Sequence, residues 1–233
     1  MIAAEAKRDG DFSKEMFWET AAKTKLGKYL TGIETNFVSD AIEPLEPHMI
    51  LDIGAGAGKF SLLAAKRNTT VVSLDLVSYG LKRLKLKNKD IHVIKADARK
   101  IPLKNEVFAA ISMIEVLDYI PELAEVFNDC NRTLKKEASF VFSFGNKASL
   151  KQKLRQLRGK SYLHSYNSIM KNLSKADFKV RRKQGYNWLP FGRTSQNRLV
   201  PFFALTEMIL GLRRIPSLSP WVIVHATKSH KLL

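Results

Sequence analysis

Residues 49–60 read MILDIGAGAGKF. Ile50, Leu51 and Ile53 form a short apolar run that is typical of a buried parallel strand. Three glycines then alternate with alanines, so the chain can turn sharply and a ligand can approach the backbone without meeting a Cβ atom. The next segment, 59–67, has the apolar spacing of a helix. The stretch therefore predicts a strand, a glycine loop and a helix whose first N–H groups are open to a ligand.

The spacing of the glycines separates two kinds of cofactor site. A dinucleotide fingerprint, G-x-G-x-x-G, would need its third glycine at position 59, which is Lys59. The chain instead has G-x-G-x-G, with Asp52 two residues before Gly54. This pattern resembles motif I of the class I S-adenosylmethionine (SAM)-dependent methyltransferases, a broad family that includes quinone-biosynthesis enzymes. The resemblance extends over residues 47–145.

Acidic residues end the next two predicted strands, in the order and spacing of that family. Asp75 could accept hydrogen bonds from both ribose hydroxyls, and Asp97, with the Ala98 backbone, could bind the adenine amino group. Taken singly, Asp75 could be a helix N-cap, Asp97 a turn residue and Asp52 a brace of the glycine loop. Together with the glycine loop, the three acids favour SAM binding.

The resemblance implies a full set of site residues. The cofactor-binding positions are Asp52, Gly54, Ala55, Gly56, Gly58, Asp75, Leu76, Asp97, Ala98 and Ile114. Transfer to a hydroxyl would benefit from a base that removes its proton. The candidates are His164, by its place in a loop, and then Tyr166, Tyr119 and Glu115. A lone loop histidine is more often an ordinary surface residue. No His, Cys or carboxylate set has the spacing of a metal site.

Hydrophobic periodicity predicts an α/β fold. The expected strands are 49–53, 70–74, 91–95, 107–114, 138–144, 178–184 and 221–227. The expected helices are 14–28, 33–43, 59–67, 78–88, 121–135, 147–158, 166–176 and 200–212. Their alternation indicates a Rossmann-like, seven-stranded, mostly parallel sheet with helices on both faces. By the family resemblance, the last two strands form an antiparallel pair at one edge.

Length and composition favour a single methyltransferase domain, 1–233. We expect residues 1–46 to form an N-terminal helical cover, 47–146 the SAM-binding core, and 147–233 a basic substrate or lid region with the last two strands. The cover could equally be a helix packed on the sheet edge. The single cysteine, Cys130, excludes a disulfide framework and is expected to be a small buried hydrophobe. With no apolar signal segment at the start, a cytoplasmic location is expected.

Charge is concentrated at one end of this basic protein, whose net charge is +17. Residues 147–233 contain 18 Lys and Arg but only 2 Asp and Glu, so this third alone carries a net +16. Aromatic and apolar residues alternate with these charges, as in the segment 186–193. Such a region could be a solvated basic face, a lid for a hydrophobic acceptor with an anionic head, or a membrane-docking surface.

The sequence therefore predicts a SAM-dependent methyltransferase acting on a small molecule at oxygen, with an anionic or amphipathic acceptor. One alternative is an RNA methyltransferase that uses the basic third for phosphate contacts. A second is a peripheral-membrane enzyme for a lipid or quinone precursor. A third is a non-catalytic, SAM-binding regulatory protein. The oligomeric state and the acceptor cannot be derived from the residues, because the fold alone does not fix function.

Overall fold

The structure is a computed structural model that describes residues 12–42, 48–67, 69–157 and 162–229. Its strands are β1 (Met49–Ile53), β2 (Thr70–Asp75), β3 (His92–Lys95), β4 (Phe108–Met113), β5 (Leu134–Gly145), β6 (Phe178–Tyr186) and β7 (Trp221–Lys228). Its α-helices are α2 (Phe17–Ala22), α3 (Lys25–Ile42), α4 (Lys59–Ala65), α5 (Ser78–Lys87), α6 (Leu123–Thr133), α7 (Leu150–Gln156), α8 (Tyr166–Lys175) and α9 (Val200–Ile209). Two short 3-10 helices are η1 (Leu117–Tyr119) and η2 (Leu212–Arg214).

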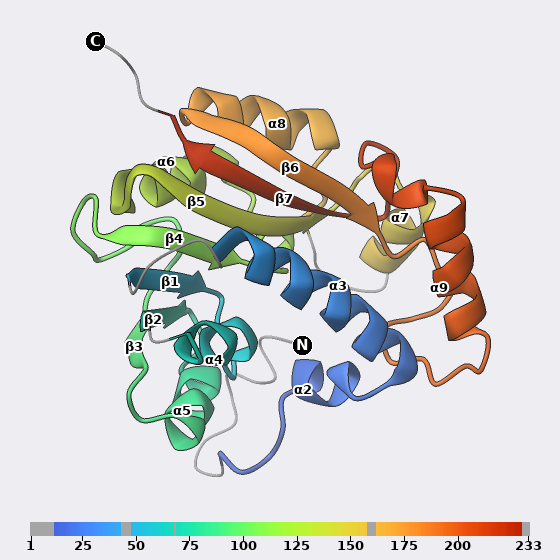
Figure 1. Cartoon of the computed structure of the whole chain (residues 1–233), viewed down its shortest axis with the longest axis horizontal. Helices are drawn as coiled ribbons and strands as arrows, with labels where there is room; N and C mark the ends of the chain where they lie inside the picture. The colour runs from blue at the N-terminus through green and yellow to red at the C-terminus, as the bar shows by residue number, and fades with distance from the viewer. Residues whose placement is uncertain (1–11, 43–47, 68, 158–161, 230–233) are drawn as a thin grey trace.

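The strands form one seven-stranded sheet in the order β3-β2-β1-β4-β5-β7-β6 (Figure 1). Neighbours from β3 to β5 are parallel, whereas β7 runs antiparallel to both β5 and β6. The predicted fold class is thus confirmed. The direction of the crossovers reverses between β1 and β4, and in open α/β sheets ligands bind outside the carboxyl ends of the strands at such a switch point.

Each face of the sheet buries its own apolar core. On one face α6 packs against β5 and α8 against β6, and Cys130 is fully buried there, as expected. On the other face α3, α4, α5 and α9 cover the sheet. In Figure 1 the long helix α3 runs diagonally in front of the sheet.

The N-terminal helices differ from the prediction. Two helices, 14–28 and 33–43, were expected, but α3 runs unbroken from Lys25 to Ile42, and the break lies earlier, after α2. Thr24 sets this boundary because its Oγ1 accepts a hydrogen bond from the Gly27 amide at 3.1 Å, as an N-cap does. A Cβ at Gly27 would lie only 1.8 Å from the Ala21 carbonyl oxygen, so glycine allows α2 to fold back onto α3.

The segment between β6 and β7 contains α9 and η2, and α9 packs against α3. The prediction extended the helix here to residue 212. The α-helix ends earlier because Gly211 adopts a left-handed conformation with φ +64°, which terminates a helix. Among the described residues no helix is both long enough and apolar enough to span a membrane.

Candidate active site at the carboxyl ends of the parallel strands

A cavity of about 700 Å³ opens at the carboxyl ends of β1 to β4. This volume lies within the range of roughly 300–1,000 Å³ that is usual for ligand pockets. Eight of the predicted cofactor residues line it: Gly54, Ala55, Gly56, Asp75, Leu76, Asp97, Ala98 and Ile114. Trp18 of α2 and Thr31 of α3 also line the cavity, so the N-terminal helices border it. Residues 1–11 and 43–46 of the predicted cover lie outside the described residues.

The glycine loop leaves space for a ligand at one position and packs closely at two others. Gly54, Gly56 and Gly58 all have positive φ, at +70°, +50° and +86°. A Cβ at Gly56 would approach only the Met16 sulfur, at 3.9 Å, so the space beside this glycine is open to a ligand. At Gly54 and Gly58 a Cβ would clash at 2.2 Å with a neighbouring apolar side chain. Gly58 is therefore a packing residue and does not line the cavity.

Asp75 is a partly buried carboxylate of the cavity wall. Its Oδ2 accepts a hydrogen bond from the Gly56 amide and its Oδ1 from the Val77 amide, each at 2.8 Å. Burial raises the pKa of this carboxyl, and the two backbone donors oppose that shift. The side chain thus fixes the glycine loop relative to β2. Each oxygen keeps acceptor capacity for the hydroxyls of a ribose, so the structure fits the role expected of Asp75.

Asp52 lies behind the glycine loop, where it is 2% exposed and does not reach the cavity. Its oxygens accept hydrogen bonds from Ser61 Oγ at 2.5 Å and Ser112 Oγ at 2.8 Å. Ser112 is its direct neighbour on β4, and residues at one register position of a sheet project from the same face. The structure therefore places Asp52 in the bracing role and not in the expected direct contact with the cofactor, because strand alternation turns this side chain away from the cavity.

The burial of Asp52 has a consequence for stability. Burial raises the pKa of its carboxyl from 3.8 to about 6, so its stabilising contribution is complete below 3.8 and is lost as pH rises through about 6. We expect Asp52→Asn, which stays neutral, to gain about 3 kcal/mol relative to the wild type between these limits. Urea unfolding of both proteins at several pH values measures this difference. A difference that does not change with pH would contradict it.

Asp97 lines the cavity but is already paired. Arg99 Nη2 lies 2.7 Å from Asp97 Oδ2, and the Arg99 amide donates to Oδ1 at 2.9 Å. The hydrogen bond from Arg99 lowers the pKa of Asp97. Arg99 also pairs with Glu122 at 3.0 Å across the mouth of the cavity. An adenine amino group would therefore share this carboxylate with Arg99.

Helix α5 touches the glycine loop through Gly80, a residue that sequence reasoning missed. A Cβ at Gly80 would lie 2.6 Å from the Gly56 carbonyl carbon and 2.8 Å from its Cα. Both neighbours are backbone atoms, which cannot turn aside as a side chain does. The sequence showed only a glycine within a predicted helix, which gives no indication of function by itself. It becomes informative once the structure shows that this helix touches the glycine loop.

We expect Gly80→Ala to weaken the binding of S-adenosylhomocysteine about tenfold or more, because α5 or the glycine loop must move. Calorimetric titration measures the affinity. Gly32→Ala on α3 is the matched control, since no described atom lies within 4 Å of its Cβ position. That control should bind normally and gain about 0.5–1 kcal/mol of stability from the better helix former. Equal affinity of Gly80→Ala and wild type would contradict the proposed contact.

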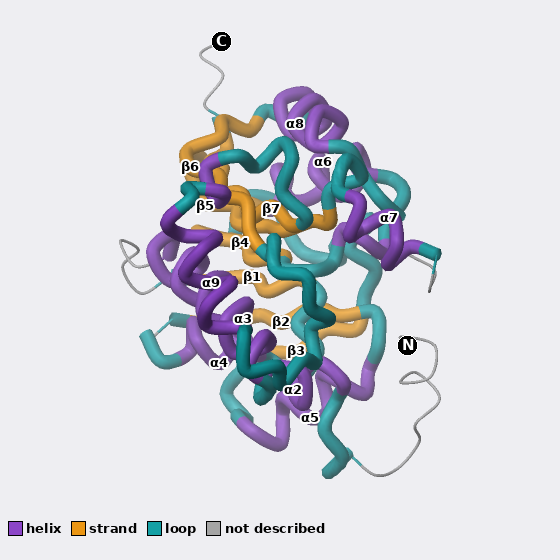
Figure 2. Tube along the Cα trace, turned by 90° about the vertical axis from the view of Figure 1, so that its right-hand side faces the viewer, coloured by secondary structure: helices purple, strands orange, loops and turns teal. Residues whose placement is uncertain are grey.

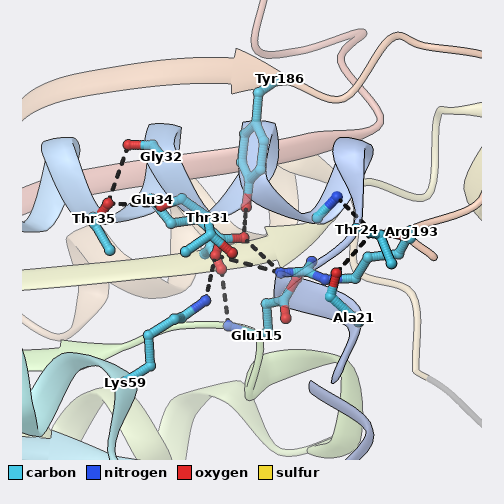
Figure 3. A network of polar contacts seen from close by, with 12 residues as sticks. Ala21, Thr24, Thr31, Gly32, Glu34, Thr35, Lys59, Glu115, Tyr186 and Arg193 are labelled. Atoms are coloured by element: carbon cyan, nitrogen blue, oxygen red, sulfur yellow. Dashed lines mark hydrogen bonds and ion pairs between the residues drawn. The ribbon is translucent and has the colours of Figure 1, made fainter. Parts of the chain in front are cut away.

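A buried charge network joins the N-terminal helix, the glycine-loop helix and the C-terminal segment (Figure 3). Glu34 of α3 is fully buried and lies 2.7 Å from Lys59 Nζ and 3.5 Å from Arg193 Nη2. Tyr186 donates its hydroxyl hydrogen to Glu34 at 3.2 Å, and Arg193 also pairs with Glu115. Burial alone would raise the pKa of Glu34, but the attraction of Lys59 and Arg193 outweighs it and lowers the pKa.

The network was not predicted, although the sequence held a signal for Glu34. This residue lies on the apolar stripe of α3 that also contains Leu30, Phe37 and Val38, where a carboxylate is unusual. Glu115, at φ +63°, is in the left-handed region that non-glycine residues seldom adopt. Its strained backbone turns the chain at the end of β4 and directs its carboxylate toward Arg193.

Of the four predicted base candidates, two line the cofactor cavity and two do not. Tyr119 and Glu115 line the cofactor cavity, and the carboxylate of Glu115 is held by Arg193. His164 lines neither described cavity, and its Nε2 lies 2.8 Å from the Ile120 carbonyl oxygen and 3.2 Å from that of Leu117. Tyr166 also lies outside both cavities and accepts a hydrogen bond from Lys183 at 2.6 Å. The structure thus brings only Tyr119 and Glu115 to the cofactor site.

A second cavity, of about 850 Å³, adjoins the first. Trp18 and Tyr119 line both, so they form the boundary between the two. Most of the remaining wall is apolar or aromatic and comes from α7, the segment 187–193 and the residues around 218–221. Lys151 is a charged residue in this wall and donates to three oxygens, namely those of the Asn187 side chain at 2.6 Å, the Asn187 backbone at 3.1 Å and Leu189 at 2.5 Å.

Known proteins share both the sequence motifs and this arrangement. Residues 51–142 match the family model of a methyltransferase domain. The chain is 14% identical to geranyl diphosphate C-methyltransferase from Streptomyces coelicolor, solved with S-adenosyl-L-homocysteine, with a TM-score of 0.65 over 94% of this chain and 84% of that one. Residues 51–142 therefore match a methyltransferase domain, and the chain has the fold of the class I SAM-dependent methyltransferases. The predicted family and cofactor are thereby confirmed.

Other members of this class resemble the chain over much of its length. A SAM-dependent methyltransferase from Mesorhizobium loti superposes with a TM-score of 0.64 at 17% identity, over 84% of this chain and 99% of that one. In sequence, the ubiquinone biosynthesis O-methyltransferase of Nitrosomonas europaea is 25% identical over 141 residues, 56% of this chain and 58% of the relative. The chain thus spans about six-tenths of the length of that curated relative.

Proposed function

We propose that this protein transfers the methyl group of SAM to a hydroxyl oxygen of a small, amphipathic acceptor held in the second cavity. The observation that carries the proposal is the junction of the two cavities at Trp18 and Tyr119. Methyl transfer requires donor and acceptor to meet in line, and two cavities that share a wall can hold them in that way. The O-methyltransferase names of several curated relatives support oxygen as the acceptor atom.

The residues of the cofactor cavity fit SAM. The open space at Gly56 and the partly buried carboxylate of Asp75 suit a ribose, and Leu76, which is 61% exposed, can pack on an adenine. When bound, SAM supplies an electrophilic methyl group on a positively charged sulfur. The chain's part is to orient the two reactants and to exclude water. Trp18 serves the second purpose, because the Arg193 guanidinium, 5.1 Å from the centre of its ring, fixes it over the junction.

Lys151 supports an acceptor with anionic character. Burial lowers the pKa of its ammonium to about 8, while the attraction of Glu207 opposes this shift, so the group remains mostly charged at neutral pH. Its three hydrogen bonds go to neutral carbonyl oxygens, and it forms no ion pair with a described carboxylate. The cavity wall therefore has a positive charge that a phenolate or another anion would balance.

We expect Lys151→Met to raise the KM for a phenolic acceptor about tenfold, because this charge is lost from the wall. Lys153→Met is the matched control, since Lys153 is exposed on the same helix. Steady-state kinetics with a fixed SAM concentration measures both variants. Equal KM values for Lys151→Met and the control would exclude a role for this charge in acceptor binding.

The proposed reaction is tested by incubating the protein with SAM and each of three acceptors: a catechol, a catechol with a long alkyl chain, and bulk RNA. Chromatography detects S-adenosylhomocysteine, and mass spectrometry locates the methyl group. We expect methylation at a hydroxyl of the alkyl catechol, faster than that of the plain catechol. Methylation of RNA alone would favour the nucleic-acid function, and no turnover with any acceptor would contradict the proposal.

A further inference from the structure

Helix α9 is apolar on its exposed side as well as on its buried side, unlike an ordinary surface helix. Its buried residues are Val200 and Glu207. The outward side chains are apolar and well exposed: Phe202 at 64%, Leu205 at 50%, Met208 at 56% and Ile209 at 71%, followed by Leu210 at 63%. We call these five residues the α9 patch. Clusters of large apolar side chains on a surface mark interaction sites, because exposing each of these side chains to water costs free energy.

Internal polar contacts hold α9 in this orientation. The Glu207 carboxylate accepts hydrogen bonds from the Tyr29 hydroxyl and the Trp188 amide, each at 2.9 Å, and lies 3.2 Å from Arg213 Nε. A buried carboxylate with three partners cannot turn outward without losing them. The patch therefore cannot be hidden by rotation of the helix in this fold.

A second group of exposed apolar residues lies on α7 and after η2. Leu150, Leu154, Leu157 and Leu218 are between 53% and 84% exposed, and we call them the α7 rim. In Figure 1 both α7 and α9 lie on the right-hand side of the molecule, and in Figure 2, which faces that side, α9 lies on the left and α7 on the right, with loops between them. Leu150, Leu154 and Leu218 also line the second cavity, so this cavity opens among exposed apolar side chains.

The charges around these groups indicate what covers them. The exposed cations nearest in sequence are Lys147 and Lys153 beside the α7 rim, and Arg198 and Arg214 at the two ends of the α9 segment. The C-terminal third has a net charge of +16, and one of its two acids, Glu207, is buried beneath the patch. A second copy of the chain would bring two such regions together against their mutual repulsion. An anionic lipid surface offers both apolar depth and the opposite charge.

We propose that the α9 patch and the α7 rim dock onto an anionic lipid bilayer, so that the second cavity opens toward the membrane. Docking itself is independent of the reaction proposed above. Only the further consequence, that an acceptor with an apolar chain enters directly from the bilayer, rests on that proposed function. The bound protein lies on the membrane without crossing it, with the patch at the boundary between headgroups and acyl chains.

Co-sedimentation with vesicles tests the proposal. We expect the wild-type protein to bind phosphatidylcholine vesicles that contain phosphatidylglycerol, more weakly without that anionic lipid, and less as salt is added. Phe202→Glu/Ile209→Glu should weaken binding at least about tenfold, because two apolar side chains no longer insert. Leu86→Glu is the matched control, since Leu86 is 70% exposed on α5, away from both groups, and this variant should bind as the wild type does.

Three further measurements, of ligand affinity, of oligomeric state and of methyl transfer, distinguish membrane docking from its alternatives. Calorimetric titration with S-adenosylhomocysteine should give equal affinity for all three proteins, which shows that the double variant is folded. Vesicle binding that the double variant retains, or that the wild type lacks, would overturn the proposal. So would a wild-type dimer that the double variant converts to a monomer in light scattering, because the patch would then belong to a second copy. Intact vesicle binding without methyl transfer would contradict only the proposed function.

Discussion

Asp75→Ala is expected to weaken the binding of S-adenosylhomocysteine by about a hundredfold or more. The ribose would lose two hydrogen bonds to a charged acceptor, each worth about 1.5–3 kcal/mol. The glycine loop would also lose the acceptor for the Gly56 amide, which Asp75 now holds at 2.8 Å. Calorimetric titration of wild type and variant with S-adenosylhomocysteine, SAM and NADH measures the effect. The two sulfur nucleotides should bind to the wild type, and NADH should not.

A matched control separates this effect from a general loss of charge. Asp90→Ala removes a carboxylate from an exposed position after α5. It should leave the affinity unchanged, because Asp90 lies outside the cofactor cavity. Asp75→Asn should fall between the two, since an amide still offers one acceptor oxygen. Wild-type affinity in Asp75→Ala would mean that the cavity does not hold the ribose as we infer.

Arg193→Ala is expected to lower the free energy of unfolding by about 3–5 kcal/mol. Arg193 is the cation shared by Glu34 and Glu115, and its removal leaves the buried Glu34 with Lys59 as its single cation and takes this ion pair from Glu115. The lowered pKa of Glu34 means that its contribution is present above the ordinary value of 4.5 and is lost as pH falls through the folded value. The deficit of the variant should therefore shrink in acid. Denaturant unfolding at several pH values measures both effects.

Two further variants test the cause. Arg182→Ala removes an arginine whose ion pair with Asp40 is about half exposed, so its cost should be at most about 1 kcal/mol. Adding Glu34→Gln to Arg193→Ala should recover part of the loss, since a neutral amide then replaces a buried carboxylate that would retain only Lys59 as its cation. A similar cost for the two arginines, or no recovery in the double variant, would show that the buried network does not stabilise the fold as described.

The strands and the glycine loop were predictable because their signals are local. The apolar run at 49–53 became β1 without a change of boundary, and Asp75 ends β2 and lines the cavity. Parallel strands bring their carboxyl ends to one edge, so residues far apart in the sequence gather there by topology alone. A pattern that combines strand ends with a glycine loop therefore locates the cofactor cavity.

The orientation of individual side chains could not be predicted in the same way. Asp52 and Asp75 are both acids at the ends of strands, yet one is buried behind the loop and the other lines the cavity. The difference depends on register, which places Ser112 beside Asp52. His164 was chosen for its place in a loop, but its ring contacts the carbonyls of Leu117 and Ile120 and lines neither cavity.

The sequence by itself determined the α/β fold, the order of its motifs, the family and the cofactor, because periodicity and glycine spacing act over a few residues. Only the tertiary structure decided which charges are buried together and which apolar residues stay outside. Glu34 and Arg193 meet because α3 and the segment after β6 pack on one face of the sheet. Helix α9 exposes its apolar side because Glu207 finds its partners inside. Contacts between distant segments fix such choices, and no local pattern encodes them.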